Sequence, residues 1–93
     1  MTFKRIAVTG AAGLIGSAVV RHLSKLNIQV TAFDAPGTPD LVPGSRIPVE
    51  QVDLLDSRMI EALEVAQPQA VVHAAAHPGG KSLREPVEDV RVN

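Results

Sequence analysis

Residues 9–16 read Thr-Gly-Ala-Ala-Gly-Leu-Ile-Gly, which places glycines at three-residue intervals, at Gly10, Gly13 and Gly16. The stretch follows a short apolar run, residues 6–8, typical of a strand buried on both faces, and precedes a segment of helical periodicity. In such a unit the first glycine permits the tight turn, the second lets the main chain approach a pyrophosphate, and the third lets the helix pack closely on the sheet. The helix N-terminus adds free N–H groups and a positive dipole end. Residues 9–16 therefore predict a dinucleotide-binding turn.

An acidic residue follows at the offset that such a site requires. Asp34 lies 18 positions after Gly16, at the end of the second expected strand, and this is close to the roughly 20-residue offset at which a carboxylate reaches a ribose 2′-hydroxyl. A carboxylate at this position would repel a 2′-phosphate, which favours NAD over NADP. The alternative interpretation is a solvated turn residue, because Asp34 precedes Ala-Pro-Gly and aspartate is common in turns.

The rest of the chain alternates helical and strand patterns. A first helix begins at Leu14 and stops near Asn27, and a second, capped by Asp56 or Ser57, runs to Ala66 before Pro68. The apolar side of the first helix consists of Ile15, Val19, Leu23 and Leu26. Strands are expected at residues 6–8, at 28–33 with Asp34 at the end, at 49–52 and at 70–73.

The other segments lack these patterns. Residues 35–48 are rich in proline and glycine and predict a surface connection without regular structure. Residues 77–86 are also loop-like, and residues 87–93 begin a helical pattern. Right-handed crossovers would place the four strands in the order 3-2-1-4, so the fold class predicted is α/β, a Rossmann-type doubly wound parallel sheet that is only partly present.

Composition excludes several classes of protein. The chain has 93 residues, 45% apolar content and a net charge of −1, so we expect one domain, whose sheet would be marginally stable unless its edges are covered. There is no cysteine, which excludes disulfides and thiolate chemistry and fits a cytoplasmic location. No basic patch, membrane span or signal peptide is apparent, so neither nucleic acid nor a membrane is expected as a partner. The three histidines, His22, His73 and His77, do not share ligand spacing, and no metal site is predicted.

Four features together resemble a known family. The glycine-rich residues 9–16, Asp34, residues 52–54 (Val-Asp-Leu) and residues 72–76 (Val-His-Ala-Ala-Ala) are similar to the extended short-chain dehydrogenases/reductases, the NAD-dependent epimerase/dehydratase family. The resemblance runs along essentially the whole chain. It implies NAD as cofactor and hydride transfer on a hydroxyl or carbonyl substrate, most commonly a sugar nucleotide, with a homodimer as a possible assembly.

The resemblance also implies roles for individual residues. Asp53 would bond the adenine amine with Leu54 beside it, the main chain at residues 74–76 would line the cofactor, and Asn93 would support the active site. The expected cofactor-binding residues are Gly10, Gly13, Leu14, Ile15, Gly16, Asp34, Asp53, Leu54, Ala74, Ala75 and Ala76. Simpler interpretations remain open, because Asp53 could cap the following helix and His73 could be a hydrogen-bonded core histidine.

The family's chemistry needs a Tyr-x-x-x-Lys pair, and this sequence contains no tyrosine. We therefore expect an N-terminal portion of a single NAD(P)-binding domain from a longer enzyme, without the remaining strands and substrate domain, and inactive by itself. A non-catalytic NAD-sensing or interaction module is the alternative. A more remote alternative is an NTPase that uses residues 75–82 (Ala-Ala-His-Pro-Gly-Gly-Lys-Ser), which resemble a phosphate-binding loop. The match is imperfect, because Ala75 replaces the first glycine and Pro86 falls within the first turns of the helix that should follow Lys81.

Overall fold

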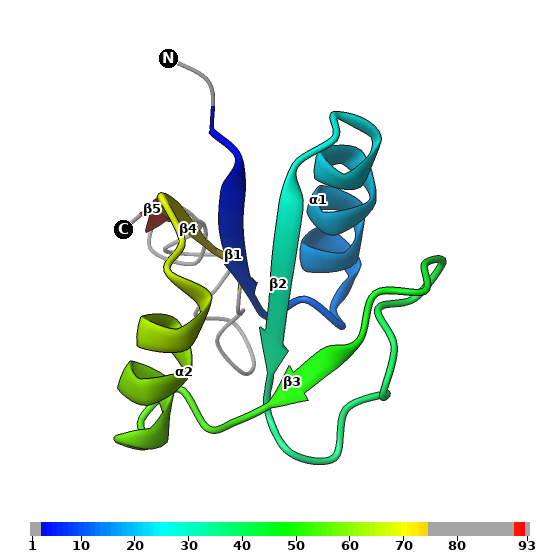
Figure 1. The fold of residues 1–93 in the computed structure, drawn as a ribbon. Coiled ribbons are helices and arrows are strands. Elements are labelled where there is room, and N and C mark those ends of the chain that lie inside the picture. Colours follow the sequence, from blue (N-terminus) through cyan, green and yellow to red (C-terminus); the bar gives the residue numbers. More distant parts are fainter. Residues whose placement is uncertain (1–2, 75–90, 93) are drawn as a thin grey trace.

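A computed structural model describes residues 3–74 and 91–92 of the chain. Within these residues, five strands and two helices are arranged as an α/β unit (Figure 1). In chain order they are β1 (Arg5–Thr9), α1 (Leu14–Lys25), β2 (Gln29–Asp34), β3 (Val49–Gln51), α2 (Arg58–Ala66), β4 (Ala70–His73) and β5 (Arg91–Val92). None of the helices in the described part has the length and apolar content needed to cross a membrane.

The strands form one sheet in the order β3-β2-β1-β4-β5. The first four are parallel, with β1 in the centre between β2 and β4. Thr9 at the end of β1 pairs with Phe33 on one side and His73 on the other, so the carboxyl ends of these strands lie side by side. The predicted α/β class and the 3-2-1-4 order of the parallel strands are therefore confirmed.

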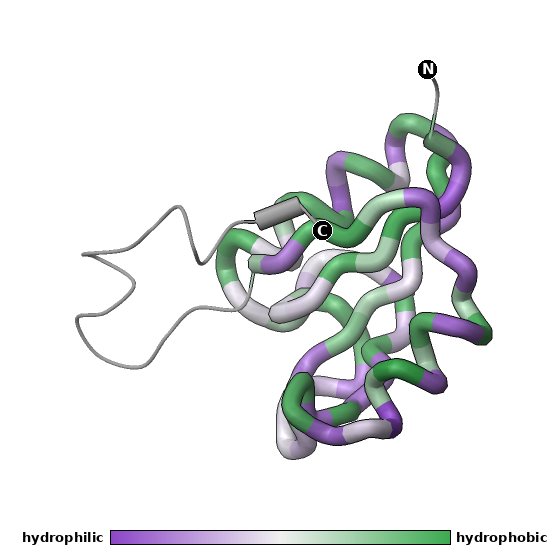
Figure 2. Tube along the Cα trace, turned by 90° about the vertical axis from the view of Figure 1, so that its left-hand side faces the viewer, coloured by the Kyte–Doolittle hydropathy of each residue, from purple (hydrophilic) through white to green (hydrophobic). Residues whose placement is uncertain are grey.

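The helices cover opposite faces of the sheet, and because side chains alternate along each strand, a strand contributes residues to the core on both faces. Ile6 and Val8 of β1 point to the face that α1 covers, and Ala7 points to the face that α2 covers. Val20 of α1 is fully buried in the apolar cluster that contains Ile6 and Val8. Phe33 of β2 is fully buried in the cluster on the other face, which contains Ala7 and Met59 of α2. In Figure 2 the helical turns show alternating hydrophobic and hydrophilic bands, as expected for helices that bury one side.

The buried side of α1 differs in part from the predicted one. Val19 and Leu23 pack against the core, but Ile15 and Leu26 are more than half exposed, and the buried positions are Gly16, Ser17 and Val20. Gly16 lies so close to the preceding turn that a Cβ would come within 2.0 Å of the Gly10 oxygen, and the side of α1 that carries Gly16 and Val20 is the buried one. Hydrophobic periodicity counts apolar side chains, so it did not indicate that a glycine would be on the buried side of the helix.

The long connection, residues 35–48, contains no helix or named strand, as expected, but it is anchored to the core. Val42 is fully buried among the residues under α1. The Arg21 Nη1 atom of α1 donates a hydrogen bond to the Pro43 carbonyl at 2.8 Å, and Leu41 forms an antiparallel bridge with Pro48. This connection therefore supplies apolar contacts that its proline-rich sequence did not predict.

The helix expected over residues 87–93 is wrong at the two positions that the structure describes. Arg91 and Val92 form β5, which pairs antiparallel with β4 through Val92 and Val72. The outer edge of a strand offers unpaired N–H and C=O groups, and a β-branched residue such as Val92 suits pairing there. A tertiary contact with β4 thus overrides the local helical pattern.

Candidate functional site

A cleft of about 490 Å³ lies at the carboxyl edge of the sheet. Its lining comes from the segments that follow each of the four parallel strands. These residues are Gly10, Gly13, Leu14, Ile15, Asp34, Ala35, Asp53, Leu54 and Ala74. The volume is within the usual range for a small-molecule site, about 300–1,000 Å³.

The position of the cleft follows from the topology of the sheet. The chain proceeds from β1 outward through β2 to β3, and then crosses back to place β4 on the other side of β1. In open α/β sheets, ligands bind outside the carboxyl ends of the strands where the strand order reverses in this way. Gly10 follows β1 and Ala74 follows β4, so the two segments at this reversal both contribute to the cleft.

The glycine-rich turn between β1 and α1 forms one wall of the cleft. Gly10 has a φ of 68°, a left-handed conformation that is strained for residues with a side chain. Its carbonyl accepts a hydrogen bond from the Gly13 N–H at 3.1 Å, and Gly13 is the N-cap of α1. The first N–H groups of α1 have no intrahelical acceptors, because the carbonyls they would need precede the helix. The start of α1, directly after the turn, therefore presents these donors at the positive end of the helix dipole.

The second and third glycines have different roles. A Cβ on Gly16 would lie 2.0 Å from the Gly10 carbonyl oxygen and 2.9 Å from the Ala11 Cα atom, so only glycine fits there. A Cβ on Gly13 would meet its nearest atom, the Gly10 oxygen, at 3.4 Å, which is ordinary van der Waals contact. Gly13 has a φ of −77°, which any residue adopts. The fold therefore excludes a side chain at position 16, whereas at position 13 only a ligand in the cleft would exclude one.

Asp34, at the end of β2, is half-buried and lines the cleft. Its Oδ2 atom accepts a hydrogen bond from the Ala12 N–H at 2.9 Å, and its Oδ1 atom accepts one from the Ala35 N–H at 2.7 Å. Each carboxylate oxygen can accept more than one hydrogen bond, so both retain capacity toward a ligand. The bond to Ala35 matches the turn interpretation, and the bond to Ala12 directs the carboxylate toward the glycine-rich turn.

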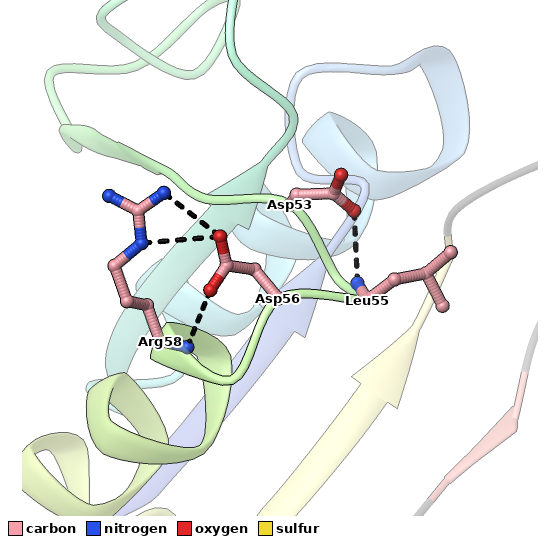
Figure 3. Close-up of polar contacts among 4 residues, drawn as sticks. All are labelled: Asp53, Leu55, Asp56 and Arg58. Atoms are coloured by element: carbon pink, nitrogen blue, oxygen red, sulfur yellow. Dashed lines mark hydrogen bonds and ion pairs between the residues drawn. The ribbon is translucent and has the colours of Figure 1, made fainter.

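Asp53 follows β3, and Ala74 follows β4. These two strands are at opposite ends of the group of four parallel strands. Its Oδ1 atom accepts a hydrogen bond from the Leu55 N–H at 2.9 Å, which stabilises the turn before α2 (Figure 3). No described residue donates to its Oδ2 atom. Asp53 therefore does not cap α2, and it combines a local turn with a place in the cleft.

Of the two residues expected to cap α2, Asp56 binds the first N–H of the helix from the position before the N-cap. Its Oδ1 atom accepts a hydrogen bond from the Arg58 N–H at 2.9 Å, and its Oδ2 atom accepts one from Arg58 Nη2 at 2.9 Å (Figure 3). The hydrogen bond from the Arg58 side chain is the main cause that lowers the pKa of Asp56 below its ordinary value, and the same contact raises the pKa of Arg58. Ser57 occupies the formal N-cap position but makes no side-chain cap.

This contact gives a pH-dependent contribution to stability. Because the pKa of Asp56 is lower in the folded chain than the ordinary value of 3.8, its contribution is present above pH 3.8 and is lost as the pH falls through the folded pKa. We expect Asp56→Asn to lower the urea midpoint slightly at pH 7, by an amount that shrinks toward low pH. The effect is small because the pair is exposed to solvent. Glu64→Gln, farther along the same helix, is the control, and a gap for Asp56→Asn that stays constant with pH would contradict this explanation.

His73, at the end of β4, is hydrogen-bonded as the simpler interpretation predicted. Its Nδ1 atom lies 2.6 Å from the Oγ1 atom of Thr9, which is buried. The Thr9 carbonyl also accepts a hydrogen bond from the Ala74 N–H at 3.1 Å. These two contacts hold the carboxyl ends of β1 and β4 together beside the cleft.

The structure brings most of the expected cofactor-binding residues to one place. Eight of them line the cleft: Gly10, Gly13, Leu14, Ile15, Asp34, Asp53, Leu54 and Ala74. Gly16, also expected among them, does not line the cleft and lies against the main chain of Gly10 and Ala11. Ala75, Ala76 and Asn93 lie outside the described residues, as does the phosphate-loop-like segment 75–82.

Two contributors were missed at the sequence level. Ala35 lines the cleft, and the Ala12 main chain binds Asp34. Both act through their position next to a predicted site residue, so adjacency is the only sequence signal that could have indicated them. Within residues 3–74 and 91–92 no three histidine, aspartate or glutamate side chains are grouped as a metal site would require.

Comparison with known proteins assigns a family to this arrangement. The model of the NAD dependent epimerase/dehydratase family matches residues 6–93, a span that includes the glycine-rich turn and all but the first residue of the described sheet. The chain belongs to this family. The resemblance found in residues 9–16, 34, 52–54 and 72–76 is therefore confirmed.

Curated relatives within the family are dehydratases. The chain is 34% identical over 99 aligned residues to dTDP-glucose 4,6-dehydratase of Salmonella typhimurium. This alignment covers 96% of this chain and 27% of the relative. The chain is 40% identical over 81 residues to a probable dTDP-glucose 4,6-dehydratase of Sinorhizobium fredii, covering 77% of this chain and 23% of the relative. The chain thus spans about a quarter of the length of these family members.

Solved structures of epimerases share the fold. UDP-glucose 4-epimerase from Brucella ovis, in complex with NAD, matches with a TM-score of 0.72 and 29% identity, covering 89% of this chain and 26% of that one. UDP-glucose 4-epimerase from Thermus thermophilus, also in complex with NAD, matches with a TM-score of 0.70 and 33% identity, covering 91% and 28%. The βαβ arrangement around the cleft is therefore that of the family.

Proposed function

We propose that the chain binds NAD in the cleft at the carboxyl edge of the sheet. The observation that supports this most directly is that Gly13, Asp34 and Asp53, which lie at or after the carboxyl ends of three different strands, line one cleft. The site also fits the cofactor sterically, because Gly13 leaves open the space that a side chain would fill beside unpaired helix N–H groups. The two solved epimerases described above were determined with NAD.

Each part of the cleft suits one part of the cofactor. The start of α1, with Gly13, Leu14 and Ile15, would hold the pyrophosphate by main-chain N–H groups and the helix dipole. Asp34 would accept the ribose hydroxyls of the adenosine half, and its charge would disfavour the 2′-phosphate of NADP. Asp53 would accept a hydrogen bond from the adenine amine, with Leu54 against the ring. The main chain from Ala74 into residues 75–76 would line the remaining length of the cofactor.

We further propose that the chain is the N-terminal portion of a single cofactor-binding domain in a longer oxidoreductase, epimerase or dehydratase. Relatives named for dTDP-glucose and UDP-glucose support a nucleotide sugar as the substrate class. NAD, when bound, supplies a hydride acceptor for a substrate carbinol. The chain itself contributes binding and orientation, and the acid–base tyrosine and lysine would come from residues outside it, since it contains no tyrosine. A homodimer of the full-length protein belongs to the same proposal.

Equilibrium titration with NAD and NADP tests the binding site. We expect Gly13→Val to weaken NAD binding about 10- to 100-fold, because a branched side chain would displace the pyrophosphate from hydrogen bonds worth ~1.5–3 kcal/mol. Asp34→Arg should weaken NAD binding by a similar factor and reduce the preference for NAD over NADP.

Matched variants separate this result from a general effect. Asp40→Arg makes the same change of charge at an exposed position outside the cleft and should leave NAD affinity unchanged. Unchanged affinity in both Gly13→Val and Asp34→Arg, or a wild-type protein that binds neither NAD nor NADP, would refute the proposed site. The non-catalytic alternative predicts binding without turnover in the full-length protein.

A further inference from the structure

Asp34 makes a long-range contact that a ribose-binding role does not require. Its Oδ2 atom accepts the hydrogen bond from the Ala12 N–H, a residue 22 positions earlier, in the middle of the glycine-rich turn. The preceding N–H of the turn is bound to the same strand, because Ala11 donates to the Phe33 carbonyl at 3.1 Å. Two consecutive main-chain groups of the turn are therefore bound to the end of β2.

The contact acts at the point that sets the shape of the turn. Ala12 immediately precedes Gly13, the N-cap of α1 and the residue whose N–H closes the turn onto the Gly10 carbonyl. A hydrogen bond from a neutral N–H to a carboxylate is roughly twice as strong as a bond between neutral groups. Asp34 is itself held by the Ala35 N–H at 2.7 Å, so the acceptor has a fixed position.

We propose that Asp34 is a positioning residue for the glycine-rich turn, in addition to its role toward the ribose. Its carboxylate holds Ala12 so that the N–H groups that follow, at the start of α1, are preorganised for a pyrophosphate. The inference rests on the proposed function, because it assumes that this turn receives a pyrophosphate. It differs from a ribose contact in its consequence: removal of the Asp34 carboxylate should weaken a ligand that has no ribose hydroxyls at all.

The probe that separates the two roles is 2′,3′-dideoxyadenosine 5′-diphosphate, which retains the adenine and the pyrophosphate. We expect Asp34→Asn to raise the Kd of this probe about 3- to 10-fold, because an amide cannot supply charged acceptors to both main-chain N–H groups. Electrostatics alone predicts the opposite sign, since removing a negative charge near an anionic probe should tighten its binding. Asp40→Asn is the control for charge, and its Kd should match that of the wild type.

A second measurement needs no ligand. In the unliganded protein, hydrogen exchange of the Ala12 amide, followed by nitrogen-15 NMR, should accelerate in Asp34→Asn and remain unchanged in Asp40→Asn. If Asp34→Asn fails to fold by circular dichroism, a main-chain ester in place of the Ala12 amide removes the donor and leaves the carboxylate intact. That variant should weaken both the dideoxy probe and NAD.

The outcomes distinguish this inference from the proposed function. If Asp34→Asn weakens NAD but changes neither the probe affinity nor the Ala12 exchange, the positioning role is overturned and the NAD site stands. Faster Ala12 exchange with unchanged probe affinity also overturns it, because the contact would then not serve binding. If the wild-type protein binds neither NAD nor the probe, the proposed function fails, whatever the exchange data show.

Discussion

Gly16→Ala is expected to destabilise the chain by at least ~3 kcal/mol, the upper end of the cost of overpacking. The added Cβ would lie 2.0 Å from the Gly10 oxygen and 2.7 Å from the Gly10 carbonyl carbon. These are main-chain atoms, so no side-chain rotation can relieve the contact, and α1 must move away from the turn. Because small domains are stable by only about 5–15 kcal/mol, urea denaturation should show a clearly lower midpoint or a largely unfolded protein.

Gly13→Ala is the matched control for this experiment. The same methyl group is added three residues earlier, where its nearest contact is 3.4 Å and the backbone conformation is allowed for alanine. The free energy of unfolding should therefore stay within about 0.5 kcal/mol of the wild-type value, or rise slightly, because alanine restricts the unfolded chain. Equal midpoints for Gly16→Ala and Gly13→Ala would show that the turn is not packed as described.

Phe33→Ala should destabilise the chain by about 3–5 kcal/mol, the usual cost of removing a buried aromatic side chain. Phe33 is 0% exposed and is the largest of the fully buried residues. It fills the space between β2 and α2, in contact with the cluster of Ala7 and Met59. The measurement is the free energy of unfolding from urea titrations with an unchanged m-value.

Phe33→Leu and Val65→Ala define the range for comparison. Leucine retains most of the apolar volume at position 33 and should lose much less stability than alanine does. Val65 is 87% exposed on α2, so its truncation should change the free energy of unfolding by no more than about 0.5 kcal/mol. A Phe33→Ala midpoint close to that of Val65→Ala would mean that the face under α2 is not a packed core.

The stability of the sheet and the geometry of the cleft depend on the same residues. Phe33 is buried under α2, its carbonyl binds the Ala11 N–H, and the next residue, Asp34, binds the Ala12 N–H. The end of β2 therefore connects the core to the turn that faces the cleft. For this reason binding measurements on variants near β2 need a parallel measurement of stability.

Local sequence was sufficient to predict most of the architecture and much of the cleft. Alternating strand and helical periods, together with the right-handed crossover rule, predicted the order of the parallel strands. Parallel strands bring their carboxyl ends to one edge, so residues at or after the ends of different strands, such as Gly13, Asp34 and Asp53, could be assigned to one cofactor site from the sequence. The glycine spacing also indicated which helix terminus faces that edge.

Tertiary structure alone determined the details that depend on contacts between distant segments. Two of these details depend on close packing: the burial of Val42 and the approach of Gly16 to the turn. Two others join positions far apart in the chain: the pairing of residues 91–92 with β4 and the hydrogen bond from Ala12 to Asp34. Local propensity and periodicity report only the preferences of neighbouring residues, worth about 1 kcal/mol or less each. Burial and pairing across the fold contribute comparable or larger free energies, and a single segment of sequence does not contain the partner that supplies them.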